Sequence, residues 1–457
     1  MAGCRICYSD EGPFISPCRC SGNRSLVHAR CLRKWQRTAR RKGIFGRGDT
    51  CHACDSPYRV KLVDERIPIG ILGGTGLVGR RLAARLARND HPFFALGPVA
   101  GSPASEGQPL KDVWNAKEEA LASHYGPTLW TPEPCPSALD GVTVSPASAL
   151  ATVDYVISAI APALGHHEDR LRDLGVAVFS ISPHDRTNAA NPLIVPEVNG
   201  LEALREEEGN FSVQLPLFKS PNCVVCGTSV ALKALETFGV EEVAMTTFQA
   251  LSGRGDAKYS PPERVVGNVF PLSGSVENTD AYQRQELLRL FPGLKKCTVF
   301  AHRVPVQNGH YVRVQCQLAR CPKSVDAVKA AFRDFQQPLS VPSAPAKPIV
   351  LFDTPGRPAP LFDADLDGGF AVAVGDVRLS EDGDLSFALV VNNLVRGAWG
   401  GALLNAELYE LLLRRRSSDY DKRRVTTTVD SSFSSSSVDD ATQEGHTTLP
   451  APPPPLK

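Results

Sequence analysis

The chain has 457 residues, of which 42% are hydrophobic and 22% charged; this is ordinary globular composition, and the length predicts two or three domains. No apolar run reaches the roughly 18 residues that a membrane span needs, and no signal-peptide pattern opens the chain, so we expect neither a membrane-spanning nor a secreted protein. The net charge of +1 is uneven, because residues 1–60 alone carry twelve basic and four acidic residues. This asymmetry predicts separate modules.

Cysteines are concentrated at the N-terminus, where seven of the thirteen fall within the first 54 residues. With one histidine they form four short knuckles, spaced C-x2-C, C-x-C, H-x2-C and C-x2-C. Zinc takes four tetrahedral thiolate or imidazole ligands, so eight ligands predict two zinc ions. A disulfide framework is the alternative, which the odd cysteine count and the histidine disfavour. The candidate metal ligands are Cys4, Cys7, Cys18, Cys20, His28, Cys31, Cys51 and Cys54.

Residues 1–60 resemble the RING-CH domain of ubiquitin ligases. The resemblance rests on the ligand order and on three segments: Pro17-Cys-Arg-Cys, Ser25-Leu-Val-His28 and Cys31-Leu-Arg-Lys-Trp35. It implies a cross-brace, in which the first and third knuckles hold one zinc and the second and fourth hold the other.

The same resemblance implies a ubiquitin-conjugating enzyme as partner, docked on an apolar patch that Ile6, Trp35 and Pro57 match. Packing of a small core is the alternative role for these side chains. The basic run from 30 to 47 holds two aromatic residues, Trp35 and Phe45; we expect a solvated helix face there and no nucleic-acid partner.

A glycine-rich turn follows the short apolar run from Ile67 to Leu72, which predicts a buried parallel strand. Apolar residues at helical spacing begin just after the turn. Strand, glycine turn and helix in this order predict a dinucleotide site in which backbone N–H groups face a pyrophosphate, and a tight turn without ligand is the alternative. The candidate cofactor-binding residues here are Gly73, Thr75, Gly76, Leu77, Val78 and Gly79.

Further strands are predicted at 93–96, 154–159 and 176–180, and a helix is predicted from Val325, Val328, Phe332 and Phe335. The strand at 93–96 is followed by Gly97-Pro-Val. That end lacks both the carboxylate typical of NAD sites and the arginine typical of NADP sites. The pattern therefore leaves the choice between the two cofactors open.

Residues 67–413 resemble aspartate-semialdehyde dehydrogenase, nearer its fungal and archaeal branch. Besides the glycine turn, the resemblance rests on Pro192-Leu-Ile-Val-Pro-Glu-Val-Asn199, Pro221-Asn-Cys223, Gln249-Ala-Leu-Ser-Gly253, Arg303 to His310 and Asn393-Leu-Val-Arg-Gly-Ala398. It implies the conversion of 4-phosphoaspartate and NADPH to aspartate semialdehyde, phosphate and NADP, in the biosynthesis of lysine, threonine and methionine. It also implies homodimers or tetramers. The cytoplasm is the expected location, with a plastid as the alternative in a photosynthetic host.

A cysteine and a distant histidine are a candidate nucleophile and base by residue type, and the resemblance assigns their roles. Cys223 would be the thiolate nucleophile and His310 the general acid/base. Arg303 would hold the α-carboxylate of the substrate as a bidentate fork, which lysine could not copy. Gln249 would orient the substrate.

Three further residues complete the expected site. Backbone N–H groups near Asn222 and Cys223 would hold the oxyanion, and Asn393 would position the nicotinamide amide. Cys226 shares a helix face with Cys223 if a helix begins there. It would then be either a thiol that resolves oxidised Cys223 or a buried small residue.

Three segments depart from the family. Ser275 and Val276 stand at its two acidic positions and Asn278 at its lysine, which removes groups that hold the substrate's amino group and phosphate. The family's P-Q-P-R reads Pro358-Ala-Pro-Leu361, and the segment that reads NADP phosphates is replaced near 98–101. Two functions remain: a working dehydrogenase with altered phosphate contacts, or a ubiquitin ligase whose dehydrogenase-like part is an inactive substrate- or cofactor-sensing scaffold. The intact catalytic set favours the first.

The expected architecture is multidomain. Residues 1–60 form a two-zinc cross-brace RING-CH domain. Residues 66–222 with 391–413 form an α/β Rossmann NADP-binding domain, and residues 223–390 form an α+β catalytic and dimerisation domain. Residues 414–457 are rich in Ser, Thr and Pro, and we expect a disordered tail.

Overall fold

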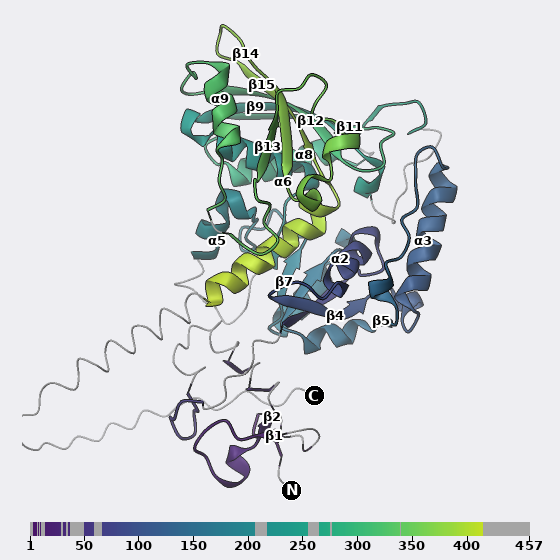
Figure 1. Ribbon diagram of the computed structural model, residues 1–457, viewed down its shortest axis with the longest axis vertical. Coiled ribbons are helices and arrows are strands. Elements are labelled where there is room, and N and C mark those ends of the chain that lie inside the picture. The colour runs from purple at the N-terminus through teal and green to yellow at the C-terminus, as the bar shows by residue number, and fades with distance from the viewer. Residues whose placement is uncertain are drawn as a thin grey trace, which may run out of the picture. The chain divides into compact units, whose positions relative to one another are not determined.

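The computed structural model describes residues 3–6, 8, 10, 14–28, 31–32, 35–36, 50–58, 66–205, 217–254, 265–274, 277–338 and 340–414 (Figure 1). The chain divides into two units, residues 1–65 with 411–457 and residues 66–410. Predictions about Cys7, Ser275 and Val276, most of the basic run and the tail beyond 414 lie outside the described residues. In the described part of the chain, no helix has the length and apolar character needed to cross a membrane.

A six-stranded, wholly parallel sheet forms the first half of the larger unit, in the order β5-β4-β3-β6-β7-β8. Its strands β6 and β7 are buried along their whole length, as expected of a parallel sheet covered on both faces. The strands are β3 Ile67–Leu72, β4 Phe94–Ala100, β5 Val144–Ser145, β6 Tyr155–Ser158, β7 Ala177–Ser180 and β8 Leu217–Lys219.

Strand β4 is longer than the predicted 93–96, and the prediction of its end was wrong. Gly97 and Pro98 lie inside the strand, where the register with β3 shifts between Ile69 and Ile71. A Cβ on Gly97 would lie 2.7 Å from the Ile69 carbonyl oxygen, so only glycine fits this irregularity. The end of the strand is therefore at Ala100, next to Gly101.

Helices pack around this sheet: α2 Leu77–Ala87, α3 Leu110–Tyr125, α4 His166–Asp173 and a helix over residues 400–414 that follows a π-helical turn at Val395–Trp399. The short helix α5 Leu201–Arg205 packs against the π-helical turn Pro196–Gly200 that precedes it. The helix over residues 400–414 is drawn in yellow-green in Figure 1 and returns to the parallel sheet. The Tyr409 ring lies 5.0 Å from that of Phe218, and Tyr155 Oη donates to Glu410 over 2.6 Å.

A seven-stranded mixed sheet forms the second half, in the order β10-β11-β9-β12-β15-β14-β13. Helices α6 Cys223–Ala234, α8 Thr279–Leu290 and α9 Val325–Arg333 pack on it, and Val328 and Phe332 are fully buried in the shared core. Phe335 lies beyond the end of α9 but still contacts this core. The strands are β9 Val240–Gln249, β10 Phe270–Pro271, β11 Lys296–Arg303, β12 His310–Leu318, β13 Ile349–Phe352, β14 Val372–Leu379 and β15 Leu385–Val391.

The N-terminal unit has little regular structure. Strand β1 Phe14–Ile15 pairs antiparallel with β2 Val27–His28, and a 3-10 turn spans Gly22–Ser25. A cluster of Cys4, Val27 and Leu32 forms its core, with Trp35 partly buried against it. So small a core does not stabilise a fold by itself, which is consistent with folding that depends on metal.

Candidate active site, nucleotide turn and metal centres

Cys223 and His310 meet although 87 residues separate them. Cys223 is the first residue of α6, His310 is the first residue of β12, and Sγ lies 3.1 Å from Nε2. Asn222 caps the helix, because its side-chain oxygen accepts a hydrogen bond from Val224 N over 3.0 Å. The sulfur is therefore held at a helix N-terminus beside an imidazole.

A backbone hydrogen bond sets the tautomer of His310. Ala250 N donates to Nδ1 over 2.9 Å, so Nδ1 is an unprotonated acceptor and the neutral ring carries its proton on Nε2. Burial, assisted by the positive charge of Arg303, lowers the pKa of His310 to about 3. In this arrangement His310 is a neutral donor facing Cys223, which is the acid half of the predicted acid/base role.

Charge around the sulfur decides how readily it ionises. Burial raises the pKa of Cys223 to about 11, against the opposing effects of Arg186, the Val224 N–H and Arg303. Arg186 was not among the predicted site residues. It lies after β7, and its Nη1 is 3.0 Å from Glu286 Oε1. No motif in the sequence marked this arginine, because only the fold brings it to the cysteine.

Arg303 is buried at the end of β11 and meets a carboxylate. Its Nη2 donates to both oxygens of Glu277 over 3.1 Å, and Nη1 donates to Ala250 O over 2.6 Å. Arg254 Nη1 lies 3.0 Å from the same carboxylate. Glu277 was missed from sequence, although it lies directly between Val276 and Asn278, at the segment where the family's acids had seemed lost. The loop still delivers one carboxylate to the site.

Gln249 ends β9 and is paired in register with Arg303, so the two predicted substrate residues lie side by side. Its Nε2 donates to Thr247 Oγ1 over 3.1 Å, and the residue is buried.

Asn222 is already engaged by α8. Its backbone N–H donates to the Glu286 carboxylate, and its side-chain oxygen accepts from Gln283 Nε2 over 3.0 Å. The Asn222 N–H is therefore not available to an oxyanion in this arrangement, which weakens that predicted role. Gln283 and Glu286 hold the turn before Cys223 and were also missed, since a helix 60 residues away carries no local signal.

The glycine turn after β3 is closely packed on backbone. Gly73 has φ +83°, and a Cβ there would lie 2.6 Å from Ala159 O; a Cβ on Gly79 would lie 2.2 Å from Gly73 O. Helix α2 has no side-chain cap at Gly76, and the buried Ser158 hydroxyl beside the turn has no hydrogen-bond partner. A bare helix N-terminus and an unsatisfied hydroxyl fit the pyrophosphate of a dinucleotide.

The remaining predicted cofactor residues lie around this turn. Thr75 packs against Gly101 at the end of β4, and Leu77 is buried in a cluster with Val78 at its edge. Asn393 is buried near His310, where its Oδ1 accepts from Gly309 N over 2.9 Å and its Nδ2 donates to Ser252 Oγ over 2.8 Å. It joins two loops of the site, and its contact with nicotinamide stays a prediction.

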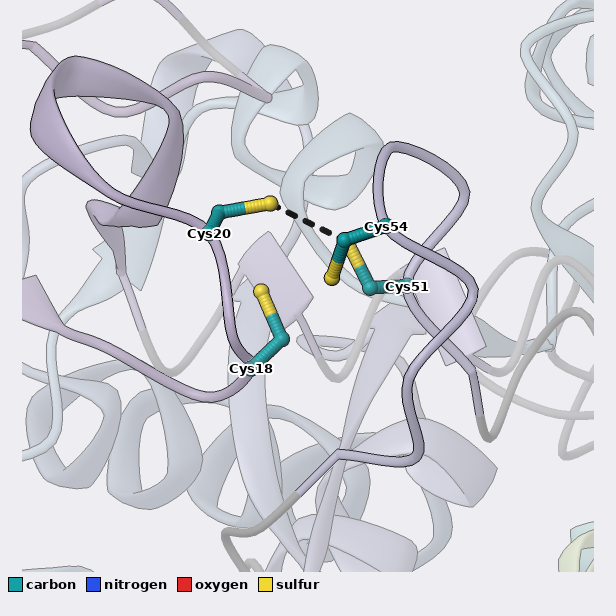
Figure 2. A group of neighbouring side chains, drawn as sticks. All are labelled: Cys18, Cys20, Cys51 and Cys54. Carbon is teal, nitrogen blue, oxygen red and sulfur yellow. Dashed lines mark hydrogen bonds between the residues drawn. The ribbon is translucent and has the colours of Figure 1, made fainter.

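Figure 2 shows four cysteine side chains of the N-terminal unit pointing toward one another: Cys18, Cys20, Cys51 and Cys54. The sulfurs of Cys20 and Cys51 are 3.7 Å apart, which is far longer than a disulfide bond. Four sulfurs bound tetrahedrally to one zinc would be about 3.8 Å apart, given zinc–sulfur bonds of about 2.3 Å. The geometry fits the second predicted zinc site.

The thiols of this cluster differ in how readily they ionise. A hydrogen bond with Ser56 lowers the pKa of Cys54 to about 6, whereas burial and neighbouring thiols raise that of Cys20 to about 12. Zinc binds cysteine as the thiolate, so a zinc ion at this cluster would have to displace the proton that Cys20 otherwise keeps.

The first predicted site is partly described. Cys4, His28 and Cys31 offer ligand atoms within 4.8 Å of one another, and Cys31 Sγ lies 3.8 Å from His28 Nδ1. The fourth predicted ligand, Cys7, is outside the described residues. The two clusters pair the knuckles as the cross-brace predicts.

Both units match known protein families. Models of the NAD binding domain and the dimerisation domain of semialdehyde dehydrogenases match residues 68–206 and 232–396, and the RING-variant domain model matches residues 4–54. An aspartate-semialdehyde dehydrogenase of Archaeoglobus fulgidus is 30% identical over 75% of this chain and 98% of its own length. The chain belongs to the aspartate-semialdehyde dehydrogenase family. The predicted resemblances and fold class are thereby confirmed.

Other relatives agree with this assignment. The aspartate-semialdehyde dehydrogenase of Aspergillus fumigatus is 33% identical over 74% of this chain and 96% of its own length. A malonyl CoA reductase of Metallosphaera sedula is 29% identical over 74% of this chain and 95% of its own length. The crystal structure of the Candida albicans aspartate-semialdehyde dehydrogenase with NADP has the same fold, with a TM-score of 0.63 at 24% identity over 76% of this chain and 99% of that one.

Proposed function

We propose that the unit of residues 66–410 interconverts 4-phosphoaspartate and aspartate semialdehyde, with NADP(H) as the hydride carrier. The observation that carries this proposal is the Cys223–His310 contact of 3.1 Å with the buried Arg303 beside it, in a chain of this family. The glycine turn from Gly73 to Gly79 would hold the pyrophosphate of the cofactor.

The proposed roles follow from the geometry, taking the reaction from the semialdehyde. The Cys223 thiolate adds to the aldehyde carbon, and the His310 Nε2–H hydrogen-bonds the oxyanion that forms. Loss of a hydride from the carbon of this adduct leaves a thioester on Cys223, and NADP held at the glycine turn would accept that hydride. Phosphate then attacks the thioester carbon and the thiolate departs. Cys223 is thus the nucleophile and the leaving group in turn.

Recognition of the substrate needs both signs of charge. Arg303 and Glu277 stand 3.1 Å apart and would take the α-carboxylate and the α-ammonium, with Gln249 beside them. At the position of the family's lysine stands Asn278, which precedes α8 in a left-handed conformation with φ 52° and offers no cation. The positive charge of Arg186 favours the Cys223 thiolate, and we propose that this side chain also binds the incoming phosphate.

The test is a turnover assay of the full chain with aspartate semialdehyde, phosphate and NADP, followed by NADPH absorbance. Cys223→Ala should abolish turnover and leave NADP binding intact, because the glycine turn is separate from the nucleophile. Cys316→Ala, a buried thiol in β12, is the matched control and should stay active. If the wild type binds NADP but does not turn over at saturating phosphate, and Ser275→Glu with Asn278→Lys does not help, the scaffold alternative holds. A parallel assay with coenzyme A in place of phosphate tests whether this chain shares the activity for which the malonyl CoA reductase relative is named.

For the N-terminal unit we propose two bound zinc ions and ubiquitin-ligase activity with a ubiquitin-conjugating enzyme. The RING-variant match and the four-sulfur cluster support it. Trp35 is half-buried, with its ring 5.5 Å from that of the exposed His52. Trp35→Ala should slow discharge of ubiquitin from a charged conjugating enzyme, whereas His52→Ala should not. No discharge with a panel of such enzymes would leave the unit a binding module.

We propose further that the protein forms homodimers through the open face of the mixed sheet. Phe248, Phe300 and Tyr311 lie on the face opposite α6, α8 and α9; Phe300 is 56% exposed, whereas Tyr311 packs partly against the cluster that contains Ala364. The matching domain model is that of a dimerisation domain. An exposed apolar face of this kind favours a second copy as its cover. Phe300→Asp should halve the mass seen by light scattering; a wild-type mass of one chain would contradict the proposal.

A further inference from the structure

Cys226 is a buried thiol that the proposed mechanism does not use. It lies three residues after Cys223 in α6, whose first turn is closed by a hydrogen bond of 2.9 Å from Cys226 N to Asn222 O. Residues three apart on a helix are neighbours on one face, with about 5–6 Å between Cβ atoms. Cys223 and Cys226 therefore share a face of the first turn.

The Cys226 side chain points back toward the start of the helix. Its Sγ lies 3.5 Å from the carbonyl oxygen of Pro221, two residues before Cys223. Side chains in helices lean toward the N-terminus, so this sulfur lies over the turn that carries the nucleophile. A modest closure of the first turn would bring the Cβ atoms to the roughly 3.5–4.5 Å that a disulfide requires.

The two sulfurs differ in access. Cys223 is half-buried, at the N-terminus of α6, whereas Cys226 is 3% exposed. A C-x-x-C pair at a helix N-terminus, with one accessible and one sheltered sulfur, is the arrangement of redox-active dithiols. An oxidant from solvent therefore reacts first with Cys223. Cys226 is oxidised only when its sulfur reacts with the oxidised sulfur of Cys223.

We propose that Cys226 resolves peroxide-oxidised Cys223 into a Cys223–Cys226 disulfide, which protects the nucleophile from irreversible oxidation. In the first step the Cys223 thiolate attacks an oxygen of a hydroperoxide. The S–O bond forms, the O–O bond breaks, the sulfur gives up two electrons, and hydroxide or an alkoxide leaves. In the second step the Cys226 sulfur attacks the sulfenic sulfur, the S–S bond forms, and the hydroxyl leaves as water with the proton of Cys226. A small dithiol restores both thiols by exchange. Protection of a catalytic nucleophile rests on the proposed function, whereas formation of the Cys223–Cys226 disulfide does not.

The test exposes the full chain to hydrogen peroxide, blocks remaining thiols with an alkylating agent and maps the digest by mass spectrometry. The wild type should yield a peptide with Cys223 and Cys226 both unalkylated and lighter by two hydrogen atoms than the reduced form. Dithiothreitol should restore both alkylation and, where turnover is measurable, activity. Because the peptide readout needs no dehydrogenase activity, its failure is distinct from failure of the proposed function.

Two variants isolate the role of Cys226. In Cys226→Ala, peroxide should drive Cys223 to sulfinic and sulfonic acid, and dithiothreitol should recover much less alkylation than in the wild type. Cys316→Ala, which removes a buried thiol in β12, should behave as the wild type does. The proposal is overturned if the wild type forms no Cys223–Cys226 peptide, or if Cys223 overoxidises equally fast with and without Cys226.

Discussion

At the scale of single residues, the site is governed by which groups face Cys223. Burial opposes the thiolate, while Arg186, Arg303 and the Val224 N–H favour it. His310 adds a donated hydrogen bond but no charge, because Ala250 N occupies Nδ1 and the ring titrates only at about pH 3. The thiolate therefore forms without a protonated histidine beside it.

This predicts the pH dependence of Cys223 alkylation. The pKa of the thiol is raised to about 11, so the reactive thiolate increases with pH across the neutral and alkaline range. The rate with iodoacetamide, followed by mass spectrometry, should rise about tenfold per pH unit from about pH 7 to 10. His310 has a lowered pKa of about 3, so the profile should show no step near its ordinary value. A step between about pH 6 and 7 would reveal a thiolate–imidazolium pair and contradict the assignment.

A second prediction concerns Glu277. Glu277→Gln keeps the shape of the side chain but removes the charge that faces Arg303 and the proposed ammonium of the substrate. Charged hydrogen bonds are worth about 1.5–3 kcal/mol, so KM for aspartate semialdehyde should rise roughly 10- to 100-fold, with a smaller change in kcat. Glu381→Gln, in an exposed loop, is the control. An unchanged KM would show that Glu277 only neutralises Arg303 and Arg254.

At the scale of elements, helix starts and strand ends carry the chemistry. Cys223 opens α6, His310 opens β12, and Gln249 and Arg303 end the adjacent parallel strands β9 and β11. The glycine turn lies at the carboxyl end of β3, as in other parallel nucleotide-binding sheets. Each element is a rigid support that holds one reacting group.

The packing of the glycine turn predicts the effect of Gly79→Ala. The new Cβ would lie 2.2 Å from Gly73 O, so the turn must shift away from α2. Overpacking of this kind costs about 1–3 kcal/mol, and NADP affinity measured by calorimetry should fall by about five- to 100-fold. Cys223 alkylation should be unchanged. Gly293→Ala, where a Cβ meets nothing within 4 Å, should keep wild-type affinity. Equal loss in both variants would remove the turn from the binding site.

At the scale of the whole molecule, the chain contains two units that are stabilised in different ways. The larger unit has extensive apolar cores in both halves, whereas the smaller one has a core of a few residues around cysteine clusters. Stability in the first comes from burial of apolar surface, and in the second we expect it to come from metal.

Chelation should therefore act on one unit alone. Purified protein should contain two zinc ions per chain, and a strong chelator should remove the N-terminal melting transition and leave the main one in place. Calorimetry with metal analysis checks both. Zinc-free protein with an unchanged N-terminal transition would contradict the metal assignment. A shift of the main transition would point to Asp169, His184 and Asp185, a three-residue cluster in the larger unit.

Features that depend on local spacing could be predicted from the sequence alone. Each cysteine knuckle brings two ligands together through a short loop, whereas the pairing of the knuckles followed from the resemblance to RING-CH domains. A strand, a glycine turn and a helix form a nucleotide cradle from 13 consecutive residues, 67–79. Cys223, His310 and Arg303 followed from the family's motifs and proved to be neighbours in the fold.

The hydrogen bonds and ion pairs among those groups depend on long-range contacts in the fold. The mixed sheet places Gln249 beside Arg303 and presents Ala250 N to His310, while α8 brings Glu286 to the turn before Cys223. These partners lie 54 to 64 residues apart, and no pattern in a linear sequence encodes a hydrogen bond over such a separation. Even the end of β4 was misplaced, because a register shift lets Gly97 and Pro98 stay inside the strand. Contacts between residues far apart in the sequence, and not residue type alone, set the tautomer of His310, the charges around Cys223 and the position of the Glu277 carboxylate.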